Sequence, residues 1–442
     1  MAENNNENFS KQLWKKHKGQ VIFSQYTPFI ISLAAGNLPV KTFEGYLYQD
    51  IHYLTAYAQA SYIANEYASD ADTKNKLQKM GDDSIRYIES YASFFKELGL
   101  EYKPGSVPKN EATISYIDFL LTTARTKVTA YIFAAMTPCI KLYAYLGWEV
   151  KLALSKEELE ANRYKRWIID NSSEDPEPQN SRNLRSAKEM DDYLDKLSAG
   201  LPQQELDEIE KLFKQGLQHE TEFNLAQQID GHEVVVPLWK ELTGEYSFAA
   251  IQTAFGSVAE SEKMSFPKDV SFGQFEAESG CISLSSRVLQ KDNLDASAYV
   301  ISAYWSDDSI KSALTKGGLA DKISHAGNKG SVESSIDKLE AFNNILQKND
   351  NEAKKFSLYI GDSVGDLLCL LKANIGVVYG SNVNFKNLEE HFLVSFVPLF
   401  KGLIQKQMEY KEQTSLLSWK PSPGVIYNFT YWAEMEAFIL GS

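Results

Sequence analysis

The chain has 442 residues, more than one ordinary hydrophobic core accommodates, so two or three domains are expected. Apolar residues make up 43% and charged residues 24%, and this composition excludes a mostly disordered, collagen-like or coiled-coil chain. The 45 basic and 59 acidic residues give a net charge of -14, which repels phosphate backbones and argues against nucleic-acid binding.

The chain begins Met-Ala-Glu-Asn-Asn-Asn, an acidic stretch without an Arg-rich presequence or a hydrophobic signal core. The sequence also lacks the run of about 18 consecutive apolar residues that a membrane span needs. Its three cysteines, Cys139, Cys281 and Cys369, are too far apart for a disulfide framework or a zinc motif, and they fit a reducing compartment. We therefore expect a cytoplasmic protein that does not enter a membrane.

Residues 1 to 243 have the pattern of helices, and the first informative helix is Gly45–Ala64. One face carries polar groups at intervals of four, three and four, namely Tyr46, Asp50, Tyr53 and Tyr57. Tyrosines alone at this spacing are compatible with core packing. A carboxylate among them is costly unless something binds it, so Asp50 meets either a structural donor or a ligand with N–H groups.

The limits of two further segments follow from capping and helix-breaking residues. Apolar residues at helical spacing predict a helix that begins at Asp82 or Asp83 and ends at Gly99. The polar segment Asp175–Lys188, which contains Pro176 and Pro178, is expected to form a surface loop.

Cys139 follows Thr137 and Pro138, and Tyr143 lies one turn further on. Pro138 either begins a helix or kinks a longer one. A helix N-terminus lowers the pKa of a nearby thiol and favours the nucleophilic thiolate. The alternative is that Cys139 is a small buried apolar residue, which is the commoner role of a free cysteine.

Glu220 interrupts another apolar helical face. That face is formed by Ile209, Phe213, Gly216, Glu220, Phe223 and Gln227. A buried glutamate has a raised pKa, as a general acid or base at neutral pH requires, although a structural hydrogen bond is an equal alternative. Cys139, Glu220 and Asp50 together suggest a pocket for thiolate attack on an electron-poor ring, one carboxylate holding ring nitrogens and the other moving protons.

After Gly244 the pattern changes to strands alternating with helices. Phe356–Ile360, Asp366–Ala373 and Ile375–Tyr379 read as strand, helix and strand, the parallel unit of an α/β sheet. Ala298–Trp305 reads as another buried strand, and Lys311–Ser335, rich in Gly, Lys and Ser, as loop. The chain is therefore divided into an all-α domain, residues 1–243, and an α/β domain, residues 244–442.

The first half resembles the TenA family, also called thiaminase II. The matching stretches are Tyr26–Asn37, Gln49–Leu54, Thr126–Tyr131, Ala135–Tyr143 and His219–Phe223. The resemblance implies a haem-oxygenase-like helical bundle without haem or another cofactor, commonly assembled as a homo-oligomer. It also implies an activity of thiamin salvage, the hydrolysis of aminomethyl-aminopyrimidine to hydroxymethylpyrimidine and ammonia.

Carried over from the family, Cys139 matches the nucleophile, Glu220 the catalytic glutamate and Asp50 the aspartate that binds the pyrimidine amino edge. Four tyrosines match positions that pack on the ring or line the cavity: Tyr53, Tyr57, Tyr116 and Tyr143. The family has a tyrosine after the helix of Trp167, where this chain has Asn171. This departure concerns the substrate more than the chemistry.

The second half resembles the haloacid-dehalogenase-like phosphatase domain that is fused to TenA in plant bifunctional thiamin-salvage proteins. The matching stretches are Ile301–Asp308, Val332–Lys338, Leu358–Val378 and Val394–Phe400. By this resemblance Ser302 binds phosphate, Lys338 is the site lysine, and Asp362 and Asp366 are acids at which Mg²⁺ is possible. The expected fold is a Rossmann-like parallel sheet.

The first phosphatase motif is missing. The resemblance requires Asp-x-Asp after the first strand, whereas the best local match supplies Glu276 and Glu278, each one methylene longer. A displacement of about 1 Å can cost a hundredfold in rate. About twenty residues separate this motif from the next strand, which leaves no room for a cap domain. We expect a capless, degenerate phosphatase domain with a structural or regulatory role.

Three functions remain open at this stage. The first is an aminopyrimidine hydrolase with a decayed phosphatase domain. The second is a related enzyme with an altered pocket that acts on another amine or heterocycle. The third is a binding or scaffold protein without activity, against which the intact Cys139, Asp50 and Glu220 argue. Ammonia release that depends on Cys139 distinguishes among them.

Overall fold

The computed structural model of the chain describes residues 8–172, 182–229, 234–236, 238, 246–252, 279–291, 296–328, 332, 334–348, 354–380, 389, 394–409 and 423–441. It divides into a helical unit that runs to Val234 and an α/β unit that begins at Val235. The boundary predicted between residues 243 and 244 lies outside the described residues. None of the described helices combines the length and the apolar character needed to cross a membrane.

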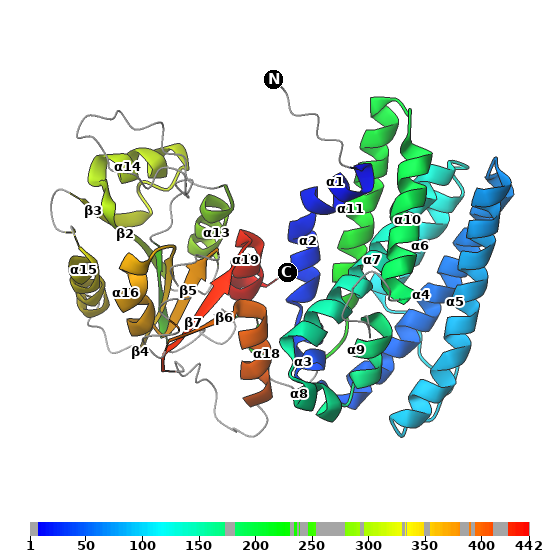
Figure 1. The fold of residues 1–442 in the computed structure, drawn as a ribbon, viewed down its shortest axis with the longest axis horizontal. Helices are drawn as coiled ribbons and strands as arrows, with labels where there is room; N and C mark the ends of the chain where they lie inside the picture. Colours follow the sequence, from blue (N-terminus) through cyan, green and yellow to red (C-terminus); the bar gives the residue numbers. More distant parts are fainter. Residues whose placement is uncertain are drawn as a thin grey trace. The chain divides into compact units, whose positions relative to one another are not determined.

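The helical unit is a bundle, coloured blue to green in Figure 1. Its helices are α1 (Phe9–Lys16), α2 (Lys18–Gln25), α3 (Pro28–Ala34), α4 (Val40–Tyr67), α5 (Ala71–Glu97), α6 (Glu111–Ala124), α7 (Thr129–Ala153), α8 (Lys156–Ala161), α9 (Lys165–Asn171), α10 (Arg182–Ser198) and α11 (Gln203–Leu225). The long helices lie side by side, α4 along α5, and α7 along both α10 and α11. The all-α prediction for this half is confirmed.

Capping residues explain where several of these helices begin. Asp70 accepts a hydrogen bond from the Thr73 backbone N–H and begins α5, and Asn110 does the same for α6 through Thr113. The predicted start of α5 at Asp82 or Asp83 is therefore wrong, because the better cap lies three turns earlier. The predicted end is confirmed, since Gly99 follows α5 with a φ of +71°.

The predicted loop Asp175–Lys188 is wrong for its second part, because α10 begins at Arg182. Residues 175–181 lie outside the described residues. Helix α10 continues an amphipathic pattern whose buried residues Ala187, Met190 and Leu194 are three and four positions apart. Because Pro176 and Pro178 disfavour a helix, the loop was predicted to extend beyond the residue at which α10 begins.

Among its described residues, the α/β unit contains a sheet of seven parallel strands in the order β3-β2-β1-β4-β5-β7-β6. The strands are β1 (Tyr246–Gln252), β2 (Ala296–Ser306), β3 (Ile323–Asn328), β4 (Lys354–Gly361), β5 (Ile375–Tyr379), β6 (Ser395–Pro398) and β7 (Val425–Phe429). The strands predicted at Ala298–Trp305, Phe356–Ile360 and Ile375–Tyr379 and the α/β class are confirmed. The strand order reverses between β1 and β4, the place where such sheets bind ligands at their carboxyl edge.

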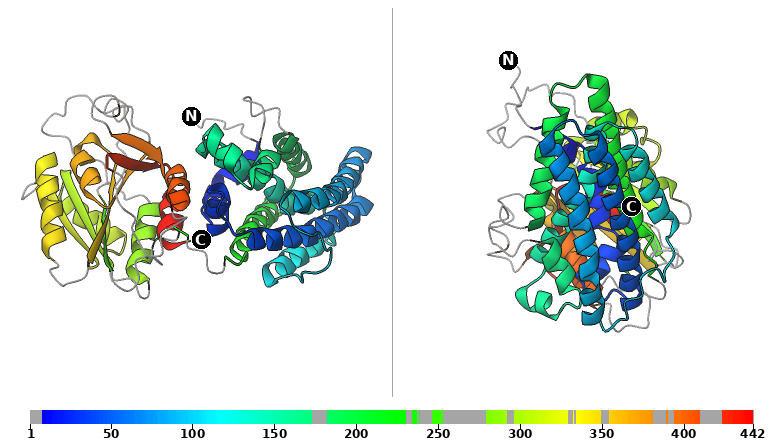
Figure 2. Two further views of the ribbon diagram at one scale, coloured as in Figure 1. Left: turned by 90° about the horizontal axis from the view of Figure 1, so that it is seen from below. Right: turned by 90° about the vertical axis from the view of Figure 1, so that its right-hand side faces the viewer.

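Helices cover both faces of this sheet, as Figures 1 and 2 show. They are α13 (Ser279–Gln290), α14 (Asp307–Lys316), α15 (Ser335–Lys348), the 3-10 turn η3 (Val364–Asp366), α16 (Leu367–Lys372), α18 (Leu399–Glu409) and α19 (Trp432–Leu440). One core joins α15 and α16 to the sheet through Phe342, Tyr359 and Cys369. Since neighbouring strand residues face opposite ways, Leu358 and Ile360 point to the other face, towards α13 and α19.

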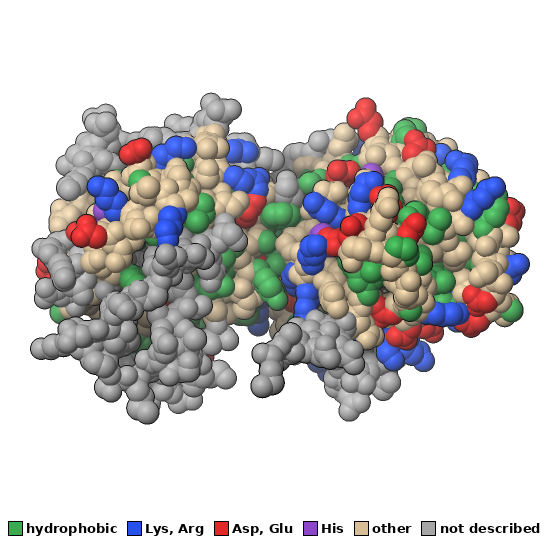
Figure 3. Space-filling view, turned by 90° about the horizontal axis from the view of Figure 1, so that it is seen from above, with side chains coloured by type: hydrophobic (Ala, Val, Ile, Leu, Met, Phe, Trp, Pro, Cys, Tyr) green, Lys and Arg blue, Asp and Glu red, His purple; other side chains and the backbone are tan. Residues whose placement is uncertain are grey.

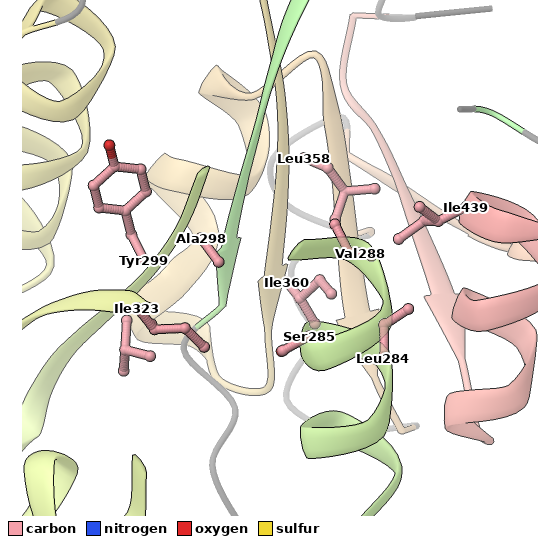
Figure 4. A pocket seen from close by; sticks show the side chains of 10 residues that line it. Leu284, Ser285, Val288, Ala298, Tyr299, Ile323, Leu358, Ile360 and Ile439 are labelled. Carbon is pink, nitrogen blue, oxygen red and sulfur yellow. The ribbon is translucent and has the colours of Figure 1, made fainter. Parts of the chain in front are cut away.

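A cavity of about 20 Å³ lies on that second face (Figure 4). Leu284, Val288, Leu358 and Ile439 are among its mostly apolar lining residues. Its size is that of about one water molecule, so it is a packing defect and not a substrate site.

The predicted loop Lys311–Ser335 is wrong. It contains the end of α14 and the whole of β3. Ser306 caps α14 through the Ser309 backbone N–H, and Gly318, with a φ of +68°, allows the turn towards β3. The glycines therefore mark one tight turn and not an extended loop.

On the face shown in Figure 3, basic and acidic side chains lie interspersed over the helical unit. Charges of both signs that alternate in this way offer no continuous patch to a polyanion on that face.

Candidate active site

Four helices bring the candidate residues together in the middle of the helical unit. Asp50, Tyr53 and Tyr57 come from α4, Tyr116 from α6, Cys139 and Tyr143 from α7, and Glu220 from α11. Each of these helices buries an apolar face, and the polar groups stand on those faces as the spacing predicts. Electrostatic coupling links Cys139 to both Glu220 and Asp50, so the three groups lie close to one another.

A chain of hydrogen bonds runs through two phenols to Glu220. The Tyr53 hydroxyl donates to the Tyr116 hydroxyl at 3.2 Å, and Tyr116 donates to Glu220 Oε1 at 2.7 Å. The two tyrosine rings pack with centroids 4.5 Å apart. All three side chains are buried. The Glu220 carboxyl is therefore fixed in orientation by a rigid donor.

Burial raises the pKa of Glu220 to about 8, against the opposing effects of hydrogen bonds from Tyr116 and Cys139. Glu220 therefore exchanges a proton close to neutral pH, as a general acid or base needs to do. The raised pKa expected from the sequence is thus present, and so is the structural hydrogen bond offered as its alternative, with Tyr116 as the donor.

Cys139 lies well inside the 25-residue helix α7, which carries Pro138 in its interior. The predicted lowering of its pKa by a helix N-terminus is therefore wrong. Burial and the charge of Glu220 raise the pKa of the thiol well above its ordinary value, although a hydrogen bond with Tyr53 acts in the opposite direction. The thiol needs a proton acceptor beside it, and Glu220 shares a hydrogen bond with it.

A glycine lets α11 approach α7 at this point. A Cβ at Gly216 would lie 2.9 Å from Pro138 Cγ and 3.0 Å from the Ala135 carbonyl oxygen. Gly216 lies one turn before Glu220, and Pro138 directly precedes Cys139. This close packing holds the carboxyl and the thiol at the same level of the bundle.

Asp50 is held from a different helix. The Tyr91 hydroxyl, from α5, donates a hydrogen bond to Asp50 Oδ2. Burial raises the pKa of Asp50 to about 6, and the hydrogen bond from Tyr91 lowers it in opposition. Asp50 is consequently mostly ionised at neutral pH and able to accept N–H groups.

The remaining predicted tyrosines lie in the same region. The Tyr57 hydroxyl is buried, has no hydrogen-bond partner within the described part of the chain, and is electrostatically coupled to Cys139. The Tyr143 ring packs edge-on against Trp167 at 6.0 Å, and its hydroxyl is hydrogen-bonded to Tyr46. An orphaned buried hydroxyl costs free energy unless a ligand or water pairs with it, so Tyr57 is suited to meet a ligand.

The candidate site residues differ in how far they are exposed to solvent. Asp50, Cys139 and Tyr143 keep part of their surface accessible, whereas Tyr53, Tyr116 and Glu220 are buried. Part of these three residues is thus accessible, while the groups that orient them are enclosed.

Sequence reasoning missed three members of this region. Tyr91 holds Asp50, Trp167 donates from Nε1 to the Tyr46 hydroxyl at 3.2 Å, and His219 stacks on Tyr116 with centroids 5.1 Å apart. Tyr91 shares a helical face with Tyr87 and Phe94, a pattern that the sequence shows but does not pair with α4. The side chain of Asn171 donates to the Trp167 carbonyl at 2.9 Å and is buried.

The α/β unit places its candidate residues at the carboxyl edge of the sheet. Asp366, which is completely buried, accepts from Lys338 Nζ at 2.8 Å and the Tyr359 hydroxyl at 3.0 Å on Oδ1. The Ser363 hydroxyl donates to Oδ2 at 2.8 Å. Both oxygens of Asp366 are thus occupied by protein donors.

Asp362 lies beside this network, and burial and then Asp366 raise its pKa to about 6. Ser302 Oγ accepts a hydrogen bond from the Trp305 backbone N–H at 3.0 Å. Glu276 and Glu278 lie outside the described residues. Magnesium prefers several oxygen ligands, and within the described part of the chain no group of three metal-binding side chains occurs.

Comparisons with known proteins agree with this division. Residues 16–231 match the model of the TENA/THI-4/PQQC family. The bifunctional TH2 protein, mitochondrial, of Arabidopsis thaliana is 31% identical over 557 aligned residues, which cover 97% of this chain and 89% of that protein.

Shorter relatives match the first half alone. An aminopyrimidine aminohydrolase of Staphylococcus saprophyticus is 27% identical over 222 residues, covering 49% of this chain and 91% of that protein. Among solved structures, a TenA homologue from P. horikoshii covers 49% of this chain and 97% of its own, with 21% identity and a TM-score of 0.43.

Proposed function

Because the chain belongs to the TENA/THI-4/PQQC family, we propose that its helical unit hydrolyses an aminopyrimidine in thiamin salvage, releasing ammonia. The observation that carries this proposal is the convergence of Cys139, Glu220 and Asp50, of which Cys139 and Asp50 keep accessible surface. The aminopyrimidine aminohydrolases among its relatives support the same reaction class.

Asp50 orients the substrate in this proposal. Its ionised carboxylate accepts N–H groups from the amino edge of the pyrimidine, while the phenol rings of Tyr53 and Tyr143 contact the flat ring. The reacting carbon is thereby held next to Cys139 Sγ, and such positioning supplies a large part of the rate.

Glu220 moves the protons. In its ionised form it takes the thiol proton of Cys139 as Sγ bonds to an electron-poor ring carbon, and the electron pair moves into the ring. Glu220 then gives the proton to the amine nitrogen, and the C–N bond breaks to release NH₃. Water adds at the exocyclic carbon and yields a proton to Glu220, the C–S bond breaks, and the proton returns to Sγ. The sum is amine plus water to alcohol plus ammonia.

Ammonia release from 4-amino-5-aminomethyl-2-methylpyrimidine tests the proposal. We expect Cys139→Ser to lower kcat by at least about a thousandfold, because the hydroxyl is a far weaker nucleophile. The matched control is Cys281→Ser, a buried cysteine of the α/β unit, which should keep full activity. Equal activity of Cys139→Ser and the wild type would exclude the mechanism.

A second substrate is favoured by Asn171. The resemblance places a tyrosine at this position, and here the amide is bound to the Trp167 carbonyl of its own helix. A wild type that releases no ammonia from the pyrimidine, but releases it from another heterocyclic amine in a Cys139-dependent way, would favour this alternative. Tight binding without turnover of any amine would favour a binding protein.

For the α/β unit we propose a degenerate phosphatase that serves a structural or regulatory role. Asp366 is occupied by Lys338, Tyr359 and Ser363, and Glu276 and Glu278 stand where the resemblance requires aspartates. We expect thiamin monophosphate hydrolysis with Mg²⁺ at less than about one hundredth of the rate of an intact relative. A comparable rate would contradict this proposal.

A further inference from the structure

The carboxylate of Asp50 has one hydrogen-bond partner among the described residues, and that partner lies on a neighbouring helix. The Tyr91 hydroxyl donates to Oδ2, whereas Oδ1 has no partner there. Asp50 keeps part of its surface accessible. One oxygen is thus bound by the protein and the other is left for an incoming donor.

Tyr91 is itself rigid. Its side chain is 2% exposed, and its ring packs between Tyr87, at a centroid distance of 5.3 Å, and Phe94, at 6.5 Å. It stands on α5, which packs along α4 and hence along Asp50. A phenol held in this way fixes the rotamer of the carboxylate that it binds.

The charge of Asp50 raises the pKa of titratable groups on its own helix and on three others. They are Tyr46 of α4, Tyr87 and Tyr91 of α5, Cys139 and Tyr143 of α7, and Glu220 of α11. Tyr91 alone among them forms a hydrogen bond to the carboxylate, and it favours the ionised form. The others are neutral at pH 7 or, in the case of Glu220, mostly protonated.

We propose that Tyr91 is a positioning residue of the active site, whose hydroxyl holds Asp50 so that Oδ1 accepts an N–H donor of the ligand. This inference rests on the proposed function in so far as that donor is the amino edge of a pyrimidine. Tyr91 does not contact the reacting atoms in this arrangement, and it acts through the orientation and the ionisation of Asp50. The arrangement selects ligands with an N–H donor at the edge and disfavours those with an acceptor there.

The test measures the ionisation of Asp50 directly in the full chain. Carboxyl carbons of aspartate are labelled with ¹³C, and the Asp50 signal is identified by its loss in Asp50→Asn. In the wild type we expect a midpoint near pH 6. In Tyr91→Phe, which keeps the ring, the midpoint should rise by about one pH unit or more, because a hydrogen bond to the charged form is lost.

The matched control is Tyr48→Phe. Tyr48 is a buried tyrosine of α4 whose hydroxyl accepts from the Lys103 backbone N–H at 2.9 Å. The Tyr48→Phe variant loses a comparable hydrogen bond and should leave the midpoint of the Asp50 titration unchanged. With the aminomethyl-aminopyrimidine, Tyr91→Phe should raise KM about tenfold and change kcat less, whereas Tyr48→Phe should leave both unchanged.

An unchanged Asp50 midpoint in Tyr91→Phe, with KM as in the wild type, would overturn the inference. A midpoint that rises in Tyr91→Phe, together with a wild type that releases no ammonia, would keep the inference and reject the proposed function. If Tyr91→Phe does not fold, 3-fluorotyrosine at position 91 gives a second measurement. Its more acidic hydroxyl should lower the Asp50 midpoint, and no change would again overturn the inference.

Discussion

At the scale of single residues, burial sets the ionisation of the groups that exchange protons in the site. The pKa of Glu220 is raised to about 8 and that of Cys139 well above its ordinary value, with desolvation as the main cause in both cases. Glu220 is therefore mostly protonated at neutral pH. Such groups make the stability of the protein depend on pH.

Replacement of Glu220 by Gln should stabilise the helical unit at neutral pH. The folded pKa of Glu220, about 8, exceeds the ordinary value of 4.5, so its contribution to stability is full below pH 4.5 and is lost as the pH rises to about 8. Gln keeps the hydrogen bond from Tyr116 and removes the titration. Thermal unfolding of wild type and variant at pH 5 and pH 8 measures the effect, expected to be on the order of a few kcal/mol at pH 8. Equal pH dependence in the two proteins would refute the assignment.

Iodoacetamide should alkylate Cys139 more slowly at pH 7 than it alkylates a free thiol, because only the thiolate reacts and burial disfavours it. In Glu220→Gln the rate at pH 9, where Glu220 is ionised in the wild type, should rise, since the negative charge that raises the thiol pKa has been removed. Mass spectrometry of the labelled peptide measures both rates. Faster labelling in the wild type than in the variant would contradict the electrostatic coupling.

The helical spacing in the sequence predicted which residues face the site, but the environment predicted for Cys139, near a helix N-terminus, was wrong. Asp50 and Glu220 stood out because a carboxylate on an apolar face needs an explanation. The position of Cys139 in the middle of α7 could not be predicted, since a proline can begin a helix or stand inside one. Tyr91 was missed because its role exists only where α5 meets α4.

At the scale of elements, the contact between α7 and α11 determines whether the thiol and the carboxyl meet. Gly216→Ala places a methyl group 2.9 Å from Pro138 and 3.0 Å from the backbone of Ala135, so α11 has to move outward. We expect at least a tenfold loss of kcat/KM with a loss of stability of about 1–3 kcal/mol. The control is Gly45→Ala on α4, where a Cβ meets no atom within 4 Å. Equal activity of the two variants would count against this contact.

The elements that sequence predicted best are those whose pattern is local. The strand Ile375–Tyr379 was predicted to the residue, because a short apolar run between polar turns has few alternatives. The start of α5 and the region from α14 to β3 were not, because several polar residues can cap a helix and glycines mark both turns and loops. Which polar residue caps a helix, and which glycine forms a turn, is determined by tertiary packing.

At the scale of the whole molecule, the two units have separate cores, so their stabilities should respond to different substitutions. Lys338→Met leaves the buried carboxylate of Asp366 without its counter-charge, which should cost the α/β unit about 3–5 kcal/mol. Calorimetry should show one transition lowered and ammonia release retained below that transition. A matched loss in both units would contradict the division into independent cores, and no loss in either unit would contradict the cost assigned to the unpaired Asp366 carboxylate. Lys316→Met on the exposed end of α14 is the control.

The site is assembled from segments that are remote in the chain, Tyr116 and Glu220 being 104 positions apart. A ribosome adding ~5–20 residues per second produces Glu220 about 5–20 s after Tyr116. During synthesis the cysteine therefore emerges before its proton acceptor exists, unshielded by α11 and open to oxidants and electrophiles. We expect thiol reagents to label Cys139 faster in ribosome-stalled chains that stop before Gln203 than in the released full-length chain, in which α11 has packed against α7 and restricts access to the thiol.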